Sequence, residues 1–299
     1  MSAQTPDVLQ RILQSTREEL QRRKRDVPQP MLEERLARAA TGGGAARGRS
    51  APSPARALRA ALTRPGIAVI AEFKRRSPSA GTLREAADLE EIVRAYERGG
   101  ASALSVLTEQ PNFGGSLDDL SAARDICELP VLRKDFILDE YQLIEARAAG
   151  ADAVLLIVAA LETAALAQLH DAAGALGLDV LVEVHDRDEL DRALGVGARL
   201  VGINNRDLRD FSVDVRRTTL LRAAIPDGIA VVSESGIADA SQLRSLEQEG
   251  VDAVLIGESL MRATDPAQAL RELIGGTPAP APGGTGAQSE TARLRAAQS

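Results

Sequence analysis

Short apolar runs recur along the middle of the chain at nearly regular intervals. They begin near Ile67, Ala103, Val131, Ala153, Val180, Leu200, Ile229 and Ala253. Each run is rich in Val, Ile, Leu and Ala and has the length of a buried strand in a parallel sheet. The segments between them, such as "ADLEEIVRAYERGG" and "DEYQLIEARAAG", have the apolar spacing of amphipathic helices. The pattern therefore predicts eight strands that alternate with helices.

The same glycine signal ends several of these predicted helices. It occurs in "GGASALSVL", "AGADAVLLI", "VGARLVGI" and "EGVDAVLIG", with Gly100, Gly150, Gly197 and Gly250 just before a strand. Glycine adopts the left-handed conformation that terminates a helix. Helix, glycine and strand repeated to a count of eight predict an α/β protein with a single (β/α)8 TIM barrel. A doubly wound open sheet is the alternative, but no G-x-G-x-x-G motif follows the first predicted strand.

The two ends of the chain differ from this middle part. Apolar residues with helical spacing precede a Gly-rich stretch, so we expect residues 1–57 to form an N-terminal helical extension and a flexible connector. Residues 58–275 would form the barrel. Residues 276–299, which include "TPAPAPGGTGAQSETARLRAAQS", lack periodicity and predict a disordered tail.

The composition of the chain argues against several classes of protein. The net charge of −7 and the pI near 5.1 argue against a nucleic-acid-binding protein, which needs a basic surface. One cysteine and two histidines exclude an internal disulfide framework and argue against a zinc site. The N-terminal residues "MSAQTPDVLQRILQ" do not have the apolar core of a signal peptide, and no run of 18 apolar residues occurs. We therefore expect a cytoplasmic protein without nucleic-acid or membrane partners.

Polar residues follow nearly every predicted strand, where a TIM barrel carries its active site. In strand order they are Glu72 and Lys74; Thr108 and Glu109; Lys134 and Asp135; Glu183; Asn204, Asn205 and Arg206; Glu234 and Ser235; and Gly257. The fourth predicted strand, in "AVLLIVAA", contributes no polar residue.

Alternation along the strands predicts where these side chains point. Glu72 and Lys74 share a face with Ile70. The same spacing relates Lys134 to Leu132, Glu183 to Leu181, and Glu234 to Val232. If these apolar partners fill the barrel, two lysines and three glutamates converge above it. The alternative for the first strand is that it ends at Ala71 and that the charges after it are solvated.

Such a cluster suits proton transfer and anion binding. Lysines bind anions, act as general acids or form Schiff bases, and glutamates exchange protons when neighbours tune their pKa. The segments "SESGI" and "IGESLM" follow the last two strands, where barrels often bind phosphate through backbone N–H groups. Gly236 and Gly257 would let the backbone approach the ligand closely. The sequence thus predicts a small phosphorylated substrate with a further anionic group that meets Lys74 or Arg206.

Other candidates carry less weight. Phe113 is a candidate for covering the substrate, because aromatic residues are rare in this chain. His185 follows Glu183 by two positions, but a loop or capping role is the simpler interpretation. Cys127 is expected to be an ordinary helix residue and His170 a surface residue, and Ser77 and Ser79 belong to a turn.

Taken together, the motifs resemble one family. They are "IAEFKRRSPSAG", "LSVLTE", "NFGGS", "LPVLRKDFILDEYQLIEARAAGADAVLLI", "LVEVHD", "VGINNRDL", "VVSESGI" and "VLIGESLMR". The chain resembles the indole-3-glycerol phosphate synthases from about residue 6 to residue 272. These carboxy-lyases of tryptophan biosynthesis convert 1-(2-carboxyphenylamino)-1-deoxyribulose 5-phosphate to indole-3-glycerol phosphate, with loss of CO2 and water and without a cofactor or metal.

The resemblance implies roles for the residues at the strand ends. Lys134 would be the general acid, Lys74 would hold the anthranilate carboxylate, and Glu183 would take part in proton transfer during dehydration. The remaining residues fall into three groups: Glu72, Asn204 and Glu234 as orienting catalytic residues; Ser77, Arg206, Ser235, Gly236, Gly257 and Glu258 as further substrate and phosphate contacts; and Leu107, Phe113, Phe136 and Leu208 as an apolar wall. The N-terminal helices would cover the mouth of the barrel. Glu258 departs from family members that carry a serine there, which is tolerable if its side chain turns outward.

Two other functions stay open at this point. A phosphoribosylanthranilate isomerase would rely on a Cys and Asp pair, and the only cysteine, Cys127, precedes the third strand. A non-catalytic barrel that binds a phosphorylated metabolite is the second alternative, and a scaffold role of the tail is compatible with catalysis. We expect a monomer or a weak homodimer.

Overall fold

The computed structural model describes residues 8–40, 57–207 and 211–275, and the statements below concern these residues. The predicted connector at 41–54, the predicted tail at 276–299 and Leu208 lie outside them. Within the described ranges, no helix is both long and apolar enough to span a membrane.

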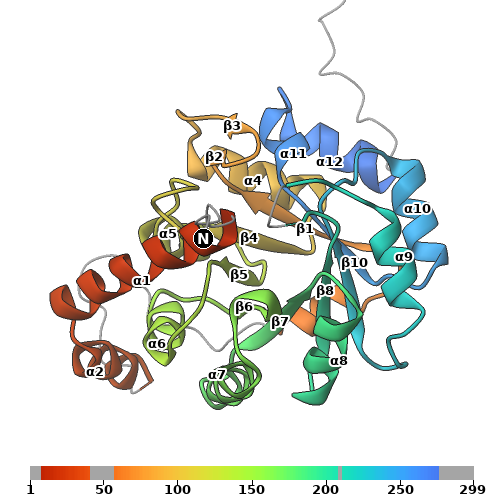
Figure 1. Cartoon of the computed structure of the whole chain (residues 1–299). Helices are drawn as coiled ribbons and strands as arrows, with labels where there is room; N and C mark the ends of the chain where they lie inside the picture. Colours follow the sequence, from red (N-terminus) through yellow and green to blue (C-terminus); the bar gives the residue numbers. More distant parts are fainter. Residues whose placement is uncertain (1–7, 41–56, 208–210, 276–299) are drawn as a thin grey trace, which may run out of the picture.

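Eight parallel strands form a closed barrel (Figure 1). They are β1 (Ala68–Phe73), β4 (Ala103–Leu107), β5 (Val131–Lys134), β6 (Ala153–Ile157), β7 (Asp179–Val184), β8 (Leu200–Asn204), β9 (Ala230–Glu234) and β10 (Ala253–Ile256). Strand β1 pairs with β4 on one side and with β10 on the other, which closes the ring. The predicted TIM barrel is confirmed, and the open sheet is excluded.

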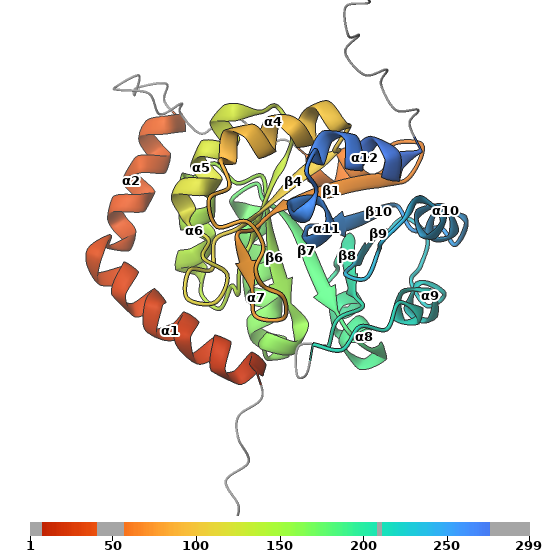
Figure 2. The same cartoon turned by 90° about the horizontal axis from the view of Figure 1, so that it is seen from above.

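Helices surround the barrel in the alternating order that the sequence predicts (Figure 2). They are α4 (Leu89–Gly99), α5 (Leu117–Ile126), α6 (Glu140–Ala148), α7 (Thr163–Ala175), α8 (Arg187–Gly195), α9 (Arg216–Arg222), α10 (Ala240–Gln248), α11 (Glu258–Arg262) and α12 (Pro266–Ile274), with a 3-10 turn η1 (Val158–Ala160) after β6. A short hairpin of β2 (Arg76–Ser77) and β3 (Gly81–Thr82) follows β1, where the sequence predicts only a turn.

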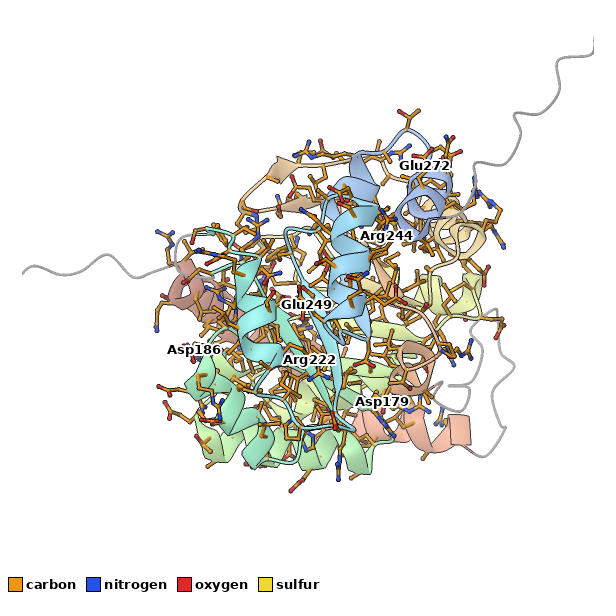
Figure 3. All side chains as sticks on the ribbon, turned by 90° about the vertical axis from the view of Figure 1, so that its right-hand side faces the viewer. Asp179, Asp186, Arg222, Arg244, Glu249 and Glu272 are labelled. Carbon is orange, nitrogen blue, oxygen red and sulfur yellow. The ribbon has the colours of Figure 1, made fainter. Side chains whose placement is uncertain are left out.

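Local sequence explains where these helices begin and end. Side chains of Asp or Ser accept backbone N–H groups at the starts of α4, α5, α6, α8, α10 and α12, as N-caps do. The predicted glycines Gly100, Gly150, Gly197 and Gly250 have φ between 79° and 93°, the left-handed region. Figure 3 shows the charged outer face of α9 and α10. There Arg222 Nε donates a hydrogen bond of 2.7 Å to the carbonyl of Gly250, which ties α9 to the turn before β10.

The core has two layers. The outer layer lies between the strands and the surrounding helices. The inner layer fills the barrel and contains the predicted apolar partners Ile70, Leu132, Leu181 and Val232. The amino ends of the strands are covered by α3 (Leu58–Leu62), whose Arg59 N–H donates to Asp179 at the start of β7. Because apolar side chains fill the interior, the polar residues at the carboxyl ends of the strands lie above a packed apolar layer.

Two N-terminal helices, α1 (Val8–Asp26) and α2 (Gln29–Ala40), lie beside the barrel next to α6 (Figure 2). Leu9, Ile12 and Leu13 of α1 join the same apolar cluster as Phe113 and Phe136, which follow β4 and β5. The helices predicted before residue 41 are thus confirmed, and α1 packs against the rim of the mouth. No described residue of α1 lines the main cavity, so its help in binding substrate stays a prediction.

Candidate active site

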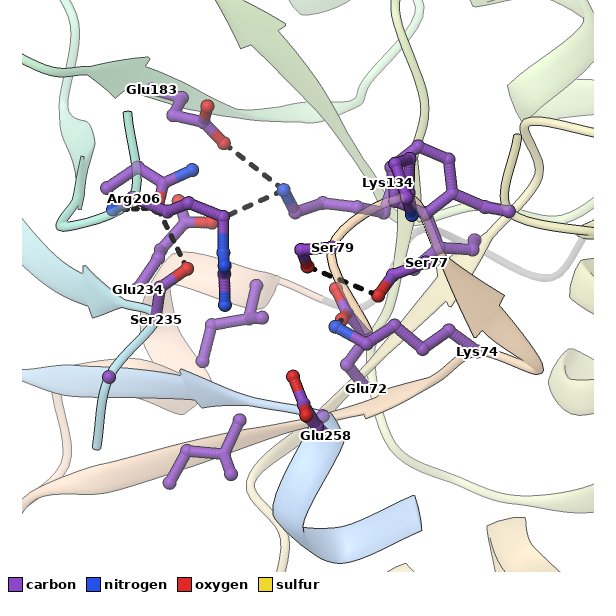
Figure 4. Close-up of a pocket in the computed structure, with 18 of the residues that line it drawn as sticks. Glu72, Lys74, Ser77, Ser79, Lys134, Glu183, Arg206, Glu234, Ser235 and Glu258 are labelled. Atoms are coloured by element: carbon purple, nitrogen blue, oxygen red, sulfur yellow. Dashed lines mark hydrogen bonds and ion pairs between the residues drawn. The ribbon is translucent and has the colours of Figure 1, made fainter. Parts of the chain in front are cut away.

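A cavity of about 480 Å³ opens at the carboxyl ends of the barrel strands. Apart from Leu208, every site residue that the sequence analysis proposes lines it: Glu72, Lys74, Ser77, Leu107, Phe113, Lys134, Phe136, Glu183, Asn204, Arg206, Glu234, Ser235, Gly236, Gly257 and Glu258. The chain contains three lysines, and two of them are in this set. The expected convergence of two lysines and three glutamates is confirmed (Figure 4).

Lys134 ends β5 and lies between two glutamates from other strands. Its Nζ is 3.1 Å from Oε2 of Glu183 on β7 and 3.3 Å from Oε2 of Glu234 on β9 (Figure 4). The Lys134 side chain is 15% exposed, whereas those two carboxylates are almost completely buried. Burial lowers the pKa of Lys134, but the neighbouring carboxylates Glu183, Glu234 and Glu72 raise it above its ordinary value. The ammonium group is therefore a charged donor that a ligand in the cavity can reach.

The two glutamates around Lys134 differ in their protonation. Burial raises the pKa of Glu234 to about 7; Lys134 opposes this shift, and the nearby carboxylates Glu183 and Glu72 add to it. Burial also acts on Glu183, but the charges of Lys134 and His185 outweigh it, so its pKa lies below the ordinary value. Glu183 is therefore ionised at neutral pH, while Glu234 exchanges a proton there.

Lys74 forms the second ion pair of the cavity. Its Nζ is 2.6 Å from Oε1 of Glu72, which lies two residues earlier on β1. Glu72 is only 4% exposed, and Ser105 Oγ donates to its other oxygen at 3.5 Å. Strand β1 extends through Glu72 to Phe73, so the alternative that the strand ends at Ala71 is wrong. Glu72 and Lys74 are largely buried, and of the charges that follow only Arg76 is exposed.

Two glycines leave space for the carboxylates of Glu234 and Glu72. A Cβ at Gly202 on β8 would collide with the carboxylate of Glu234. A Cβ at Gly257, after β10, would come within 2.6 Å of Oε1 of Glu72. The sequence analysis assigns Gly257 to the approach of the backbone to phosphate, and the structure adds this second reason for a glycine.

Asn204 and Ser235 connect the ends of β8 and β9. Asn204 Oδ1 accepts hydrogen bonds from Ser235 Oγ at 2.9 Å and from the Arg206 backbone N–H at 3.0 Å. Ser235 has φ of 66°, a conformation that is uncommon for a residue with a side chain. These contacts fix the turn that carries Ser235 and Gly236 at the cavity wall.

The apolar part of the wall comes from Leu107, Phe113 and Phe136, as expected, with the Phe rings 6.4 Å apart. The sequence analysis did not identify Phe211, which also lines the cavity and whose carbonyl accepts a hydrogen bond from the Arg206 guanidinium. The rarity of aromatic residues could have revealed it, since three of the four Phe residues line the cavity.

The end of the cavity between β9 and β10 is bordered by Ser235, Gly236, Gly257 and Glu258. The Glu258 side chain is 40% exposed and pairs with Arg262 at 3.3 Å. Arg262 also lines the cavity, so the condition that the sequence analysis sets for a carboxylate at this position stays a prediction.

Several polar residues at the strand ends do not line this cavity. Thr108 donates at 2.6 Å to Asp135, which does line the cavity. Glu109 accepts the backbone N–H groups of Asn112 and Phe113 and so shapes a loop. Asn205 holds the β9 turn by donating to the carbonyl of Ser235. The contacts of Thr108, Glu109 and Asn205 therefore stabilise the loops after the strands.

The cysteine and the two histidines of the chain also lie outside the cavity. Cys127 is buried at the end of α5, and His170 lies on the outer helix α7 with 21% of its side chain exposed. His185 follows β7 and contacts Glu183. Across the described ranges, no group of three or more His, Cys, Asp or Glu side chains is placed to hold a metal ion.

Comparison with known proteins identifies close relatives. The sequence profile of the family described as indole-3-glycerol phosphate synthase matches residues 9–273. Indole-3-glycerol phosphate synthase 2 of Streptomyces coelicolor is 55% identical over 226 residues, which cover 76% of this chain and 88% of the relative. The indole-3-glycerol phosphate synthase of Micrococcus luteus is 47% identical over 268 residues, which cover 88% of this chain and 96% of the relative.

Solved structures of similar shape support the fold alone. A 3-hexulose-6-phosphate synthase from Salmonella typhimurium superimposes with a TM-score of 0.57 at 15% identity and covers 70% of this chain and 97% of its own. A thiamine phosphate pyrophosphorylase from Pyrococcus furiosus gives a TM-score of 0.53 at 20% identity and covers 73% and 96%. At such identities the likeness indicates a shared barrel and no more.

Proposed function

Because this chain belongs to the indole-3-glycerol phosphate synthase family, we propose that the two lysine–glutamate clusters of its cavity carry out the family's ring closure. The chain is a carboxy-lyase of tryptophan biosynthesis that forms indole-3-glycerol phosphate with loss of CO2 and water. The observation that carries the proposed roles is the position of Lys134 and Lys74, each held by glutamates at the mouth of one apolar-walled cavity.

Ring closure calls for an acid at the ketone. The ring carbon that bears the carboxylate attacks the ketone carbon of the sugar chain, a carbon–carbon bond forms, and the carbonyl oxygen takes up a proton. We assign that proton to Lys134, which is protonated and reachable from the cavity. An alkoxide is a stronger base than an amine, so the transfer is favourable despite the raised pKa of Lys134. A preorganised donor at the developing charge is the arrangement that lowers such a barrier.

The carboxylate of the substrate is assigned to Lys74. Its ammonium keeps donors for a ligand while Glu72 fixes its position. The carboxylate then leaves as CO2, and the electrons of the broken bond restore the aromatic ring. The apolar wall formed by Leu107, Phe113 and Phe136 suits the aromatic ring and limits hydration of the leaving group.

Dehydration completes the indole. The new hydroxyl leaves as water with a proton from an acid, and a base takes one proton from the substrate as the double bond forms. Because Glu183 is ionised and lies 3.1 Å from the Lys134 ammonium, we assign it as the base. The proton that Glu183 takes from the substrate then passes from it to the leaving hydroxyl, so one carboxylate serves both transfers. Glu72, Glu234 and Asn204 would orient the lysines and the substrate hydroxyls.

The phosphate and the other polar groups of the substrate are assigned to the remaining residues that line the cavity. Ser235, Gly236, Gly257 and Glu258 would hold the phosphate, largely through backbone N–H groups, and Ser77 and Arg206 would bind polar groups of the substrate. A cysteine-dependent isomerase finds no support, because Cys127 is buried on α5 outside the cavity.

At the scale of the chain, we propose that residues 58–275 form the catalytic domain, with residues 1–57 as an extension and 276–299 as a tail. We also propose a monomer in the cytoplasm. The small number of large apolar side chains exposed on the described surface supports a monomer.

The role of Lys134 is tested with Lys134→Met, which keeps the side-chain length and removes the charge. Indole-3-glycerol phosphate formation from 1-(2-carboxyphenylamino)-1-deoxyribulose 5-phosphate is followed by fluorescence. We expect kcat to fall by about 10²- to 10⁴-fold, the usual contribution of a general acid. Lys24→Met is the matched control, since Lys24 pairs with Asp139 on the outer surface of the barrel. Turnover of Lys134→Met at the rate of this control would remove the assigned role.

A further inference from the structure

His185 contacts Glu183 on the side that Lys134 leaves open. Glu183 Oε2 pairs with Lys134, whereas Glu183 Oε1 lies 3.5 Å from Nε2 of His185. Both of these facing atoms are closed to solvent, and neither forms a hydrogen bond within the described residues, so their contact is an ion pair. The two groups therefore interact directly, with no room for water between them.

A second carboxylate holds the opposite side of the imidazole. Glu189 on α8 places Oε2 at 3.0 Å from Nδ1 of His185. The same Oε2 accepts the backbone N–H of His185 at 2.7 Å, which fixes the carboxylate in place. His185 thus lies between two carboxylates, one at each ring nitrogen, and its side chain is only 10% exposed.

This arrangement determines the charge of the ring. A carboxylate only accepts hydrogen bonds, and a neutral imidazole has an N–H on only one nitrogen. One of the two carboxylates would then face a lone pair. Both contacts are attractive when each nitrogen carries a proton, that is, when the ring is an imidazolium.

The charged groups that face His185 agree with this protonation. Burial lowers the pKa of His185, but the hydrogen bond to Glu189 and the charges of Glu183 and Glu189 raise it overall, while Arg217 on α9 opposes the shift. In return, the positive charge of His185 is one of the causes that hold the pKa of Glu183 down.

We propose that His185 is a positioning residue: as an imidazolium fixed by Glu189, it orients the carboxylate of Glu183 and keeps it ionised beside Glu234. The inference rests on the proposed role of Glu183 in proton transfer. His185 does not line the cavity, so its effect is expected on kcat and not on substrate binding.

The protonation of His185 can be measured without any assay of activity. The chain has two histidines, so its imidazole NMR spectrum contains two titrating signals, and His170→Asn assigns them. We expect His185 to titrate above the ordinary histidine value in the wild-type protein and at lower pH in Glu189→Gln and in Glu183→Gln. Titration at or below the ordinary value, or no response to either substitution, would overturn the proposal.

The kinetic test uses His185→Gln, which keeps a hydrogen-bond donor and removes the charge. Without the imidazolium the pKa of Glu183 rises, so the acid limb of the kcat–pH profile should move to higher pH. We expect kcat at pH 6 to fall by about 10- to 100-fold, as when a group that orients a catalytic residue is lost, with KM changed less than about 2-fold. The double variant with Glu189→Gln should be no worse than His185→Gln alone, and His170→Asn should behave as wild type.

Failures of the two proposals can be told apart. Wild-type turnover in Glu183→Gln would sink the role of Glu183, and with it the role of His185. An inactive Glu183→Gln together with an unshifted acid limb in His185→Gln would sink only the role of His185. A drop in kcat that is equal at all pH values would indicate a merely structural residue, which contradicts the proposal.

Discussion

Each lysine of the cavity meets a different electrostatic environment. Lys74 has Glu72 beside it, whereas Lys134 has two buried glutamates within 3.3 Å. Two adjacent carboxylates with one ammonium between them cannot both ionise without cost, so the proton affinity of one of them rises. In this protein that residue is Glu234.

Substitution of Glu234 should therefore change how stability depends on pH. The pKa of Glu234 is about 7 in the folded protein and near 4.5 ordinarily, so its burial disfavours folding increasingly between those values. Above pH 7 this penalty is fully present, and below pH 4.5 it is absent. Glutamine carries no such penalty. Relative to wild type, Glu234→Gln should thus gain on the order of 1–3 kcal/mol of unfolding free energy between pH 4.5 and pH 8.

Urea unfolding at the two pH values measures this difference. Glu90→Gln, which alters an exposed carboxylate on α4, is the control and should give the same offset at both. If the difference in unfolding free energy between Glu234→Gln and wild type were the same at both pH values, Glu234 would have an ordinary pKa in the folded protein. The same variant should lose activity, because the orienting contact to Lys134 is weakened.

At the scale of one element, β5 presents opposite chemistry on its two faces. Lys134 points into the cavity, whereas Arg133 points outward and is completely buried. Arg133 donates to Asp135 at 2.8 Å and to the carbonyl of Gln142 at 2.6 Å, and it also contacts Glu145 on α6. Since Glu145 pairs in turn with Arg23 of α1 at 3.1 Å, this network connects β5 to α6 and to the N-terminal helix.

Removal of the Arg133 side chain should strongly lower the free energy of unfolding. Arg133→Met leaves Asp135 and Glu145 buried with less compensating charge, and breaking a buried pair in this way destabilises by about 3–5 kcal/mol. Guanidinium unfolding should show this loss. The matched control is Arg94→Met, whose exposed pair with Glu90 should contribute less than about 1 kcal/mol. A loss as small as that of the control would mean that the network does not hold β5 in place.

Over the whole molecule, few large apolar side chains are exposed on the described surface, as expected for the proposed monomer. Its exposed large apolar side chains are Met31, Val213, Val215, Leu220 and Ile274, which lie on α2, near α9 and on α12. The chain also carries a net charge of −7, which opposes self-association.

Sedimentation equilibrium should therefore give a single species near 31.6 kDa. Leu220→Glu tests the most exposed of these apolar side chains, at 72%, and should leave the mass unchanged. A wild-type mass near twice the chain mass, reduced by Leu220→Glu, would instead identify the α9 face as a dimer interface.

Periodicity and motifs in the sequence were enough to predict the eight strands, the closed barrel and more than half of the residues that line the cavity. These follow from local rules, because a period of two along a strand decides which side chains face inward. Glu72, Lys134, Glu183 and Glu234 could be placed together on that basis, and family motifs supplied their roles. The same rules did not separate Glu72 from Glu109, since loop geometry after β4 turns Glu109 away from the cavity.

Which groups are in contact, and what charge they carry, depends on the folded arrangement of distant segments. Lys134 and Glu183 are 49 residues apart, and their contact depends on the register of the closed barrel. The space at Gly202 for Glu234, the cavity face of Phe211 and the contact of His185 with Glu183 all arise between segments that only folding brings together. A pKa depends on burial and on neighbours in space, so the proton of Glu234 could not be assigned before those neighbours were known.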